Sequence, residues 1–98
     1  MTIERYINMI ILSQSAEIAL RSLIPEKQEK LMQSIQQLEK FPQDSTLRDI
    51  VFKVEGGTRD HLYTLKAPLQ MRILFQYLGD RKEILEIVPY ARLKNYAW

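Results

Sequence analysis

The sequence contains no cysteine and only one histidine, His61, among its 98 residues. The absence of thiols excludes disulfides and thiolate chemistry, and it removes the usual ligands of zinc. A single histidine excludes most histidine-based metal sites, and His61 itself is expected to be a surface or turn residue. We therefore predict neither a metal nor a small-molecule cofactor.

Long apolar runs are also missing. No apolar segment approaches the roughly 20 residues that span a bilayer, and the amino terminus lacks the basic-then-apolar order of a signal peptide. We expect no membrane association, and a reduced cytoplasmic setting is compatible with the cysteine-free composition. A chain of 98 residues can build one hydrophobic core, so residues 1–98 are expected to form a single domain.

The net charge is only +2, which by itself does not indicate a nucleic-acid-binding protein. The distribution of charge is more informative, because basic residues gather toward the C-terminus. They are Arg81, Lys82, Arg92 and Lys94, with Arg72 expected nearby in space. A local basic patch can bind phosphate without a large global charge.

The first half of the chain predicts one strand and two helices. Residues 6–12 are almost continuously apolar, which is typical of a strand buried on both faces and therefore central in its sheet. Ser13 and Ser15 offer capping oxygens for a first helix, and Pro25 is placed to open a second. The apolar stripes of these two helices are Ala16, Ala19, Leu20 and Leu23, then Leu31, Ile35 and Leu38. The short linker between the helices predicts a helical hairpin.

The second half reads as an antiparallel meander. From Leu69 to Tyr77 every odd position is apolar or aromatic, a period of two that indicates a strand with one buried face. Further strands are expected over residues 61–66 and 83–89, with turns at residues 67–68 and 79–80, and residues 51–54 form either a brief strand or a packed loop. The predicted class is α+β: an N-terminal strand, a helical hairpin, then a three- to four-stranded meander in one small twisted sheet.

Three short motifs carry a resemblance to a known family. They are Leu62-Tyr-x-Leu65, Met71-Arg-Ile-Leu-Phe75 and Arg92-x-x-x-Tyr96. The chain resembles the RelE/ParE toxins of bacterial toxin–antitoxin pairs, which have a similar arginine before an apolar-apolar-aromatic triplet. Many members also end in an arginine four residues before a tyrosine.

The resemblance implies a toxin neutralised by a cognate antitoxin protein. Ribonucleolytic members of the family cut messenger RNA on the ribosome without a metal, and this is the activity we predict. Other members block DNA gyrase with the same fold and no ribonuclease site, which is the alternative. An inactive relative that only binds its antitoxin is a third reading. Many nucleolytic members have a histidine or lysine where this chain has Tyr90 and Ala91.

Metal-free RNA cleavage needs three functions around the scissile phosphate. A group must accept the proton of the 2′-hydroxyl, cations must neutralise the phosphate, and the leaving 5′-oxygen must be protonated. Arg72 and Arg92 suit the second task, because the guanidinium fork can bind two phosphate oxygens. Tyr96 is the candidate proton carrier, provided that nearby cations lower its pKa. Burial of Tyr96 as a C-terminal anchor is an equally open reading.

Three further basic residues are candidates for binding the substrate. Lys66 matches the basic residue that often ends the first meander strand in the family, and Lys94 lies between the final arginine and tyrosine. Arg59 follows a glycine pair and is placed to reach nucleic acid. A purely structural reading is open for Arg72 as well, in which it pairs with Glu86 on a neighbouring strand.

Overall fold

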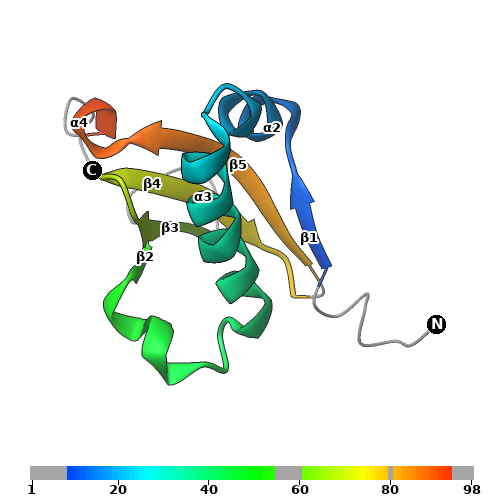
Figure 1. The fold of residues 1–98 in the computed structure, drawn as a ribbon. Helices are drawn as coiled ribbons and strands as arrows, with labels where there is room; N and C mark the ends of the chain where they lie inside the picture. The colour runs from blue at the N-terminus through cyan, green and yellow to red at the C-terminus, as the bar shows by residue number, and fades with distance from the viewer. Residues whose placement is uncertain (1–8, 55–60, 80, 94–98) are drawn as a thin grey trace.

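The computed structural model describes residues 9–54, 61–79 and 81–93 (Figure 1). The strands are β1 (Met9–Leu12), β2 (Val51–Lys53), β3 (Leu62–Ala67), β4 (Met71–Tyr77) and β5 (Arg81–Pro89). The α-helices are α2 (Gln14–Arg21), α3 (Pro25–Gln37) and α4 (Tyr90–Leu93), and two 3₁₀-helices are η1 (Leu38–Lys40) and η2 (Ser45–Asp49). None of the helices in these ranges is long and apolar enough to cross a membrane.

The strands form one five-stranded mixed sheet in the order β1-β5-β4-β3-β2. β1 pairs with β5 in parallel, and the other neighbours are antiparallel. In Figure 1, α3 crosses one face of this sheet and α2 lies beside β5. The α+β prediction is confirmed, including the order of one strand, two helices and a meander. The segment at residues 51–54 proves to be a strand at the edge of the sheet.

The prediction that the first strand is central is wrong. β1 lies at the edge of the sheet, where β5 is its one neighbour among the described strands. Ile11 is 39% exposed, whereas Ile10 and Leu12 on the other face of the strand pack against the core. The apolar run therefore covers one buried face and one face that stays open to solvent. Residues 6–8 of the predicted strand lie outside the described ranges.

The beginnings of both helices follow the local chemistry that the sequence predicts. The Ser13 side chain accepts a hydrogen bond from the Ala16 amide at 3.0 Å, and its hydroxyl donates to the Leu85 carbonyl of β5 at 2.8 Å. Ser13 therefore caps α2 and also ties it to the sheet. Pro25 occupies the first turn of α3, where a missing amide proton costs nothing.

The turn before β4 is longer than predicted. Leu69 was expected to begin the strand, but Leu69 and Gln70 have positive φ angles of 65° and 56°. This left-handed conformation breaks the extended backbone, so the strand begins at Met71. His61 also has a positive φ and lies exposed in a turn, as predicted.

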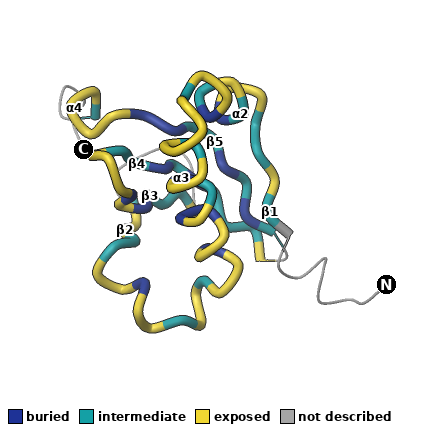
Figure 2. The backbone as a smooth tube through the Cα atoms, viewed as in Figure 1, coloured by how far each residue is buried: buried dark blue, intermediate teal, exposed yellow. Residues whose placement is uncertain are grey.

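The core lies between the helices and the face of the sheet that carries Ile73 and Phe75, both fully buried. The predicted period of two in β4 is thereby confirmed. Leu31 and Ile35 of α3 belong to the same cluster, and an aromatic group formed by Phe41, Tyr63, Phe75 and Tyr77 extends it. Figure 2 shows the buried segments in the central strands and exposed chain over much of the loop below α3.

Candidate functional site

Arg72 lies on the face of the sheet opposite to the core. It precedes the buried Ile73 in β4, and alternation along the strand turns the two side chains to opposite faces. We call this the outer face; it carries Lys66, Thr64, Phe52 and Arg72. The register pairs Arg72 with Lys66 of β3 on one side and with Val88 of β5 on the other.

The pairing of Arg72 with Lys66 places two cations on one patch of the outer face. Side chains directly opposite each other on antiparallel strands have Cβ atoms about 4.5–5.5 Å apart, and like charges there are destabilising. An anion bound between the two side chains would relieve this repulsion. The register therefore makes this part of the sheet suited to an anionic ligand.

The Arg72 guanidinium contacts an aromatic ring from the end of β5. Its central carbon lies 4.3 Å from the centroid of the Tyr90 ring, within range of a cation–π interaction. An Arg72 Nη also lies 3.4 Å from the carbonyl oxygen of Met71, a long hydrogen bond. The Tyr90 amide donates to the Gln70 carbonyl at 2.8 Å, which fixes the first residue of α4 against the turn before β4.

The alternative reading of Arg72, as the partner of Glu86, is wrong. The Glu86 carboxylate accepts from the Ser15 hydroxyl, which lies 2.8 and 2.9 Å from its two oxygens. Within the described ranges, no carboxylate forms an ion pair with Arg72. The charge of Arg72 is therefore not neutralised by an acidic side chain of this part of the fold.

The other predicted site residues divide into two groups. Arg92 is exposed on α4, at the same end of the sheet as Arg72, because α4 begins two residues after Val88. Residues two positions apart on a helix do not face each other, so Arg92 and Tyr90 project from different sides of α4. The predicted residues Tyr96, Lys94 and Arg59 lie outside the described ranges.

Tyr90 was not among the predicted site residues. From the sequence, Tyr90 was noted only because many nucleolytic members of the family have a histidine or lysine at this place. Its position directly after Pro89 was the available signal, since an aromatic residue at the end of β5 lies beside the start of β4 once the two strands pair. That pairing register is a tertiary property, and the sequence alone leaves it open.

Comparison with solved structures finds the same arrangement of strands and helices in several toxins. The archaeal RelE–RelB complex from Pyrococcus horikoshii matches with a TM-score of 0.65 and 21% identity, over 86% of this chain and 96% of that chain. A variant of the E. coli toxin RelE with two arginines replaced by alanine matches with a TM-score of 0.65 and 13% identity, over 88% of this chain and 86% of that chain.

A ParDE toxin–antitoxin system from P. aeruginosa matches more loosely, with a TM-score of 0.51 and 20% identity over 86% of this chain and 97% of that chain. No protein-family model matches the sequence, and no curated protein matches it. The structural matches decide the fold. This chain has a RelE/ParE-like toxin fold.

In this RelE/ParE-like fold, fewer of the C-terminal basic side chains are exposed and unpaired than the sequence indicated. Lys82 was counted among the C-terminal basic residues, but it is only 2% exposed. Its Nζ donates to the carbonyl of Glu39 at 3.4 Å and lies 5.7 Å from the centroid of the Tyr77 ring. Arg81 pairs with the Glu83 carboxylate at 3.4 Å. Of this group of basic residues, Arg72 and Arg92 are the described ones that lie at the end of the sheet near α4.

Burial lowers the pKa of Lys82, and the nearby Glu39 carboxylate partly offsets this effect. Between the lowered pKa and the usual value of 10.5, the folded protein has released a proton that the unfolded chain still holds. Stability therefore rises with pH in that window, and at neutral pH the full cost of burying the charge remains. We expect Lys82→Met to unfold about 5 °C higher than the wild type at pH 7.

This difference in Tm should shrink as the pH rises through the lowered pKa of Lys82, because the wild-type side chain then loses its proton in the folded state. Thermal unfolding of both proteins at pH 7, 8.5 and 10 checks the prediction. All other titrating groups are common to the two proteins, so the pH dependence of the difference in Tm reports the protonation of Lys82. A gap that stays constant with pH, or a variant less stable than the wild type, would contradict the assignment.

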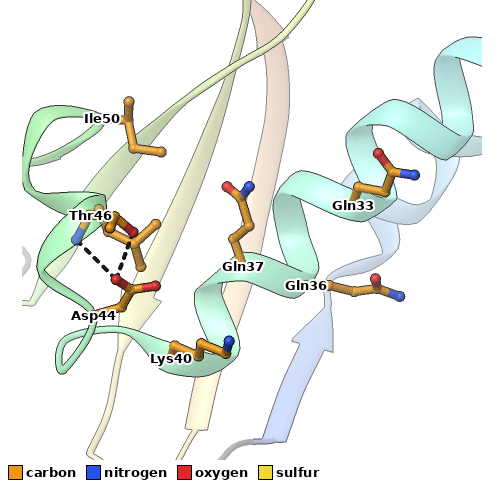
Figure 3. A pocket seen from close by; sticks show the side chains of 8 residues that line it. Gln33, Gln36, Gln37, Lys40, Asp44, Thr46 and Ile50 are labelled. Carbon is orange, nitrogen blue, oxygen red and sulfur yellow. Dashed lines mark hydrogen bonds between the residues drawn. The ribbon is translucent and has the colours of Figure 1, made fainter.

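A hollow of about 590 Å³ lies on the helical side of the fold, between α3, η1 and η2 (Figure 3). Its lining is mostly polar and consists of Gln33, Gln36, Gln37, Lys40, Asp44, Thr46, Leu47 and Ile50. Asp44 caps η2, accepting from the Thr46 amide at 2.9 Å and from its hydroxyl at 2.6 Å, and these bonds lower its pKa. The Asp44 carboxylate, the acidic group of the hollow, is thus used to cap η2.

Proposed function

We propose that this protein is the toxin of a toxin–antitoxin pair and acts as a metal-independent, ribosome-dependent endoribonuclease on messenger RNA. The observation that carries the proposal is the position and the ion-pairing of Arg72. It lies on a strand of the sheet, opposite Lys66 and against Tyr90, without an acidic partner among the described residues. The RelE/ParE-like toxin fold supports the same reading.

The proposed reaction begins with attack of the 2′-hydroxyl on the adjacent phosphorus. Arg72, with Arg92 from α4, neutralises the negative charge that builds up on the phosphate oxygens. Tyr96 accepts the proton of the 2′-hydroxyl or returns one to the leaving 5′-oxygen, a role for which a phenol needs nearby cations to lower its pKa. The products are a 2′,3′-cyclic phosphate and a free 5′-hydroxyl.

Further basic residues bind the message in this proposal. Lys66 contacts the phosphate next to the one held by Arg72, since the two side chains are adjacent on the outer face. Lys94 and Arg59 contact the flanking backbone. Such contacts contribute affinity without sequence preference.

A cognate antitoxin is the proposed protein partner. Solved structures with the same fold include complexes of RelE with RelB and of YafQ with DinJ. Phe52, at the edge strand β2 on the outer face, is 49% exposed, and Ile11 of the opposite edge strand is 39% exposed. Apolar side chains at sheet edges are suited to being covered by a strand or helix of a partner.

Inhibition of DNA gyrase without RNA cleavage is the second candidate, and the match to the P. aeruginosa ParDE system favours it. The same basic end of the sheet, or the helices, would then dock a protein. Both candidates produce growth arrest, so arrest alone does not separate them.

The test is tightly controlled expression, followed by primer extension on cellular messenger RNA. We expect growth arrest within one generation and new 5′ ends inside coding regions that disappear when ribosomes are blocked from the message. Arrest without new ends, together with loss of supercoiling by purified gyrase, would support the second candidate instead. If the expressed protein caused no growth arrest and no cleavage, the toxin proposal would be overturned. The remaining interpretation would be an inactive relative that binds its antitoxin.

A further inference from the structure

We propose that Tyr90 is a positioning residue for Arg72: its ring holds the guanidinium on the outer face, and the N–H groups that do not donate to the Met71 carbonyl can bind phosphate. This inference rests on the proposed function and adds to it a residue outside the predicted set. The geometry that carries it is the 4.3 Å contact between the guanidinium carbon and the ring centroid.

An arginine side chain on a sheet surface has many rotamers, and binding in any one of them costs entropy. Within the described part of the chain, two contacts restrict Arg72 before any ligand arrives: the Tyr90 ring and the 3.4 Å hydrogen bond to the Met71 carbonyl. The long hydrogen bond is weak by its geometry. The ring therefore provides most of the restriction.

The nature of the contact matters as much as its strength. A guanidinium has five N–H donors, and an aromatic ring attracts the cation through the face of the ring without supplying a charged hydrogen-bond acceptor. A carboxylate partner in place of the ring would occupy the same N–H groups that a phosphate needs. The contact with Tyr90 restrains Arg72 without a carboxylate, so the N–H groups that do not donate to the Met71 carbonyl stay available.

The ring is itself held in place by the backbone. The Tyr90 amide donates to the Gln70 carbonyl at 2.8 Å, and Gln70 immediately precedes β4. This bond joins the start of α4 to the turn from which Arg72 emerges. The Tyr90 side chain nevertheless remains at the surface, since the residue is 44% exposed. Substitution there should leave the core intact.

The test combines a spectroscopic readout with a double-mutant cycle, using the wild type, Tyr90→Phe, Tyr90→Leu, Arg72→Ala and the Arg72→Ala/Tyr90→Leu double variant. The ¹⁵N heteronuclear NOE of the Arg72 Nε–H group reports its rigidity without any substrate. We expect a rigid group in the wild type and in Tyr90→Phe, which keeps the aromatic face, and a mobile group in Tyr90→Leu. Thermal unfolding verifies that every variant is folded.

Cleavage of ribosome-bound message under single-turnover conditions completes the cycle. Tyr90→Leu should lower the rate about tenfold, and Tyr90→Phe should restore it. In the Arg72→Ala background, Tyr90→Leu should have no further effect. A rigid Arg72 in Tyr90→Leu, or the same tenfold loss with and without Arg72, would overturn the inference. A wild type that cleaves no message refutes the proposed function, while the NOE still decides the positioning role.

Discussion

Arg72→Ala is expected to abolish growth arrest and to lower the rate of message cleavage by at least about 100-fold. Removing one preorganised donor from a site that stabilises transition-state charge typically costs about 10²–10³ in rate. Arg72 is half-buried on a strand between two paired neighbours, and its cross-strand partner Lys66 lacks the planar fork that binds two phosphate oxygens. Growth curves and primer extension measure the two effects.

Arg81→Ala is the matched control for charge. Arg81 lies at the opposite end of β5, seven residues from Val88, which is a distance of roughly 23 Å along an extended strand. This variant removes the same charge far from the site and should still arrest growth. Arg72→Lys keeps the charge without the planar fork and should be intermediate. A folded Arg72→Ala protein that cleaves messages at the wild-type rate would refute the role of Arg72.

Phe75→Ala should destabilise the protein by about 3–5 kcal/mol, the cost of emptying a buried aromatic site. Phe75 is fully buried, and its ring lies 5.5 Å from those of both Phe41 and Tyr63, in edge-to-face and stacked geometry. Domains of this size have a total stability of about 5–15 kcal/mol, so the variant should be partly unfolded at 37 °C. Urea denaturation followed by circular dichroism measures the difference.

Phe52→Ala provides the comparison for the same chemical change on the outer face. Phe52 is 49% exposed on β2, and its truncation should change stability by no more than about 0.5 kcal/mol. If the free energy of unfolding of Phe75→Ala lay within about 1 kcal/mol of the wild-type value, the assignment of Phe75 to the core would be wrong. The result also bears on function, because Phe75 and Arg72 share one strand and the packing of Phe75 holds that strand in place.

Much of the fold follows from short-range chemistry. Ser13 and Pro25 begin their helices where side-chain hydrogen bonding and a fixed φ angle favour helix starts. Ile73 and Phe75 are buried because alternation along β4 turns them both to one face. These features depend on residues within a few positions of each other, so a pattern along the chain is sufficient to predict them.

The residues of the site illustrate the opposite case. Alternation along β4 is enough to turn Arg72 away from the core, but its neighbours depend on which strands pair and in what register. The contact with Tyr90 follows from that register, and Glu86 is turned to another partner by the Ser15 hydroxyl of α2. Lys82 is likewise buried by distant segments, since β1 pairs beside it and both η1 and Tyr77 contact its ammonium group. From the sequence, Lys82 was grouped with the basic residues expected to form a patch near the C-terminus.

Local patterns along the chain were thus enough to establish the α+β class, the helix starts, the buried face of β4 and the outward direction of Arg72. Their reach is a few residues, the range over which backbone periodicity and capping act. The edge position of β1, the burial of Lys82 and the pairing of Arg72 with Lys66 and Tyr90 arise from contacts between distant segments. Such contacts depend on the total packing energy of the sheet and helices, which no single segment contains.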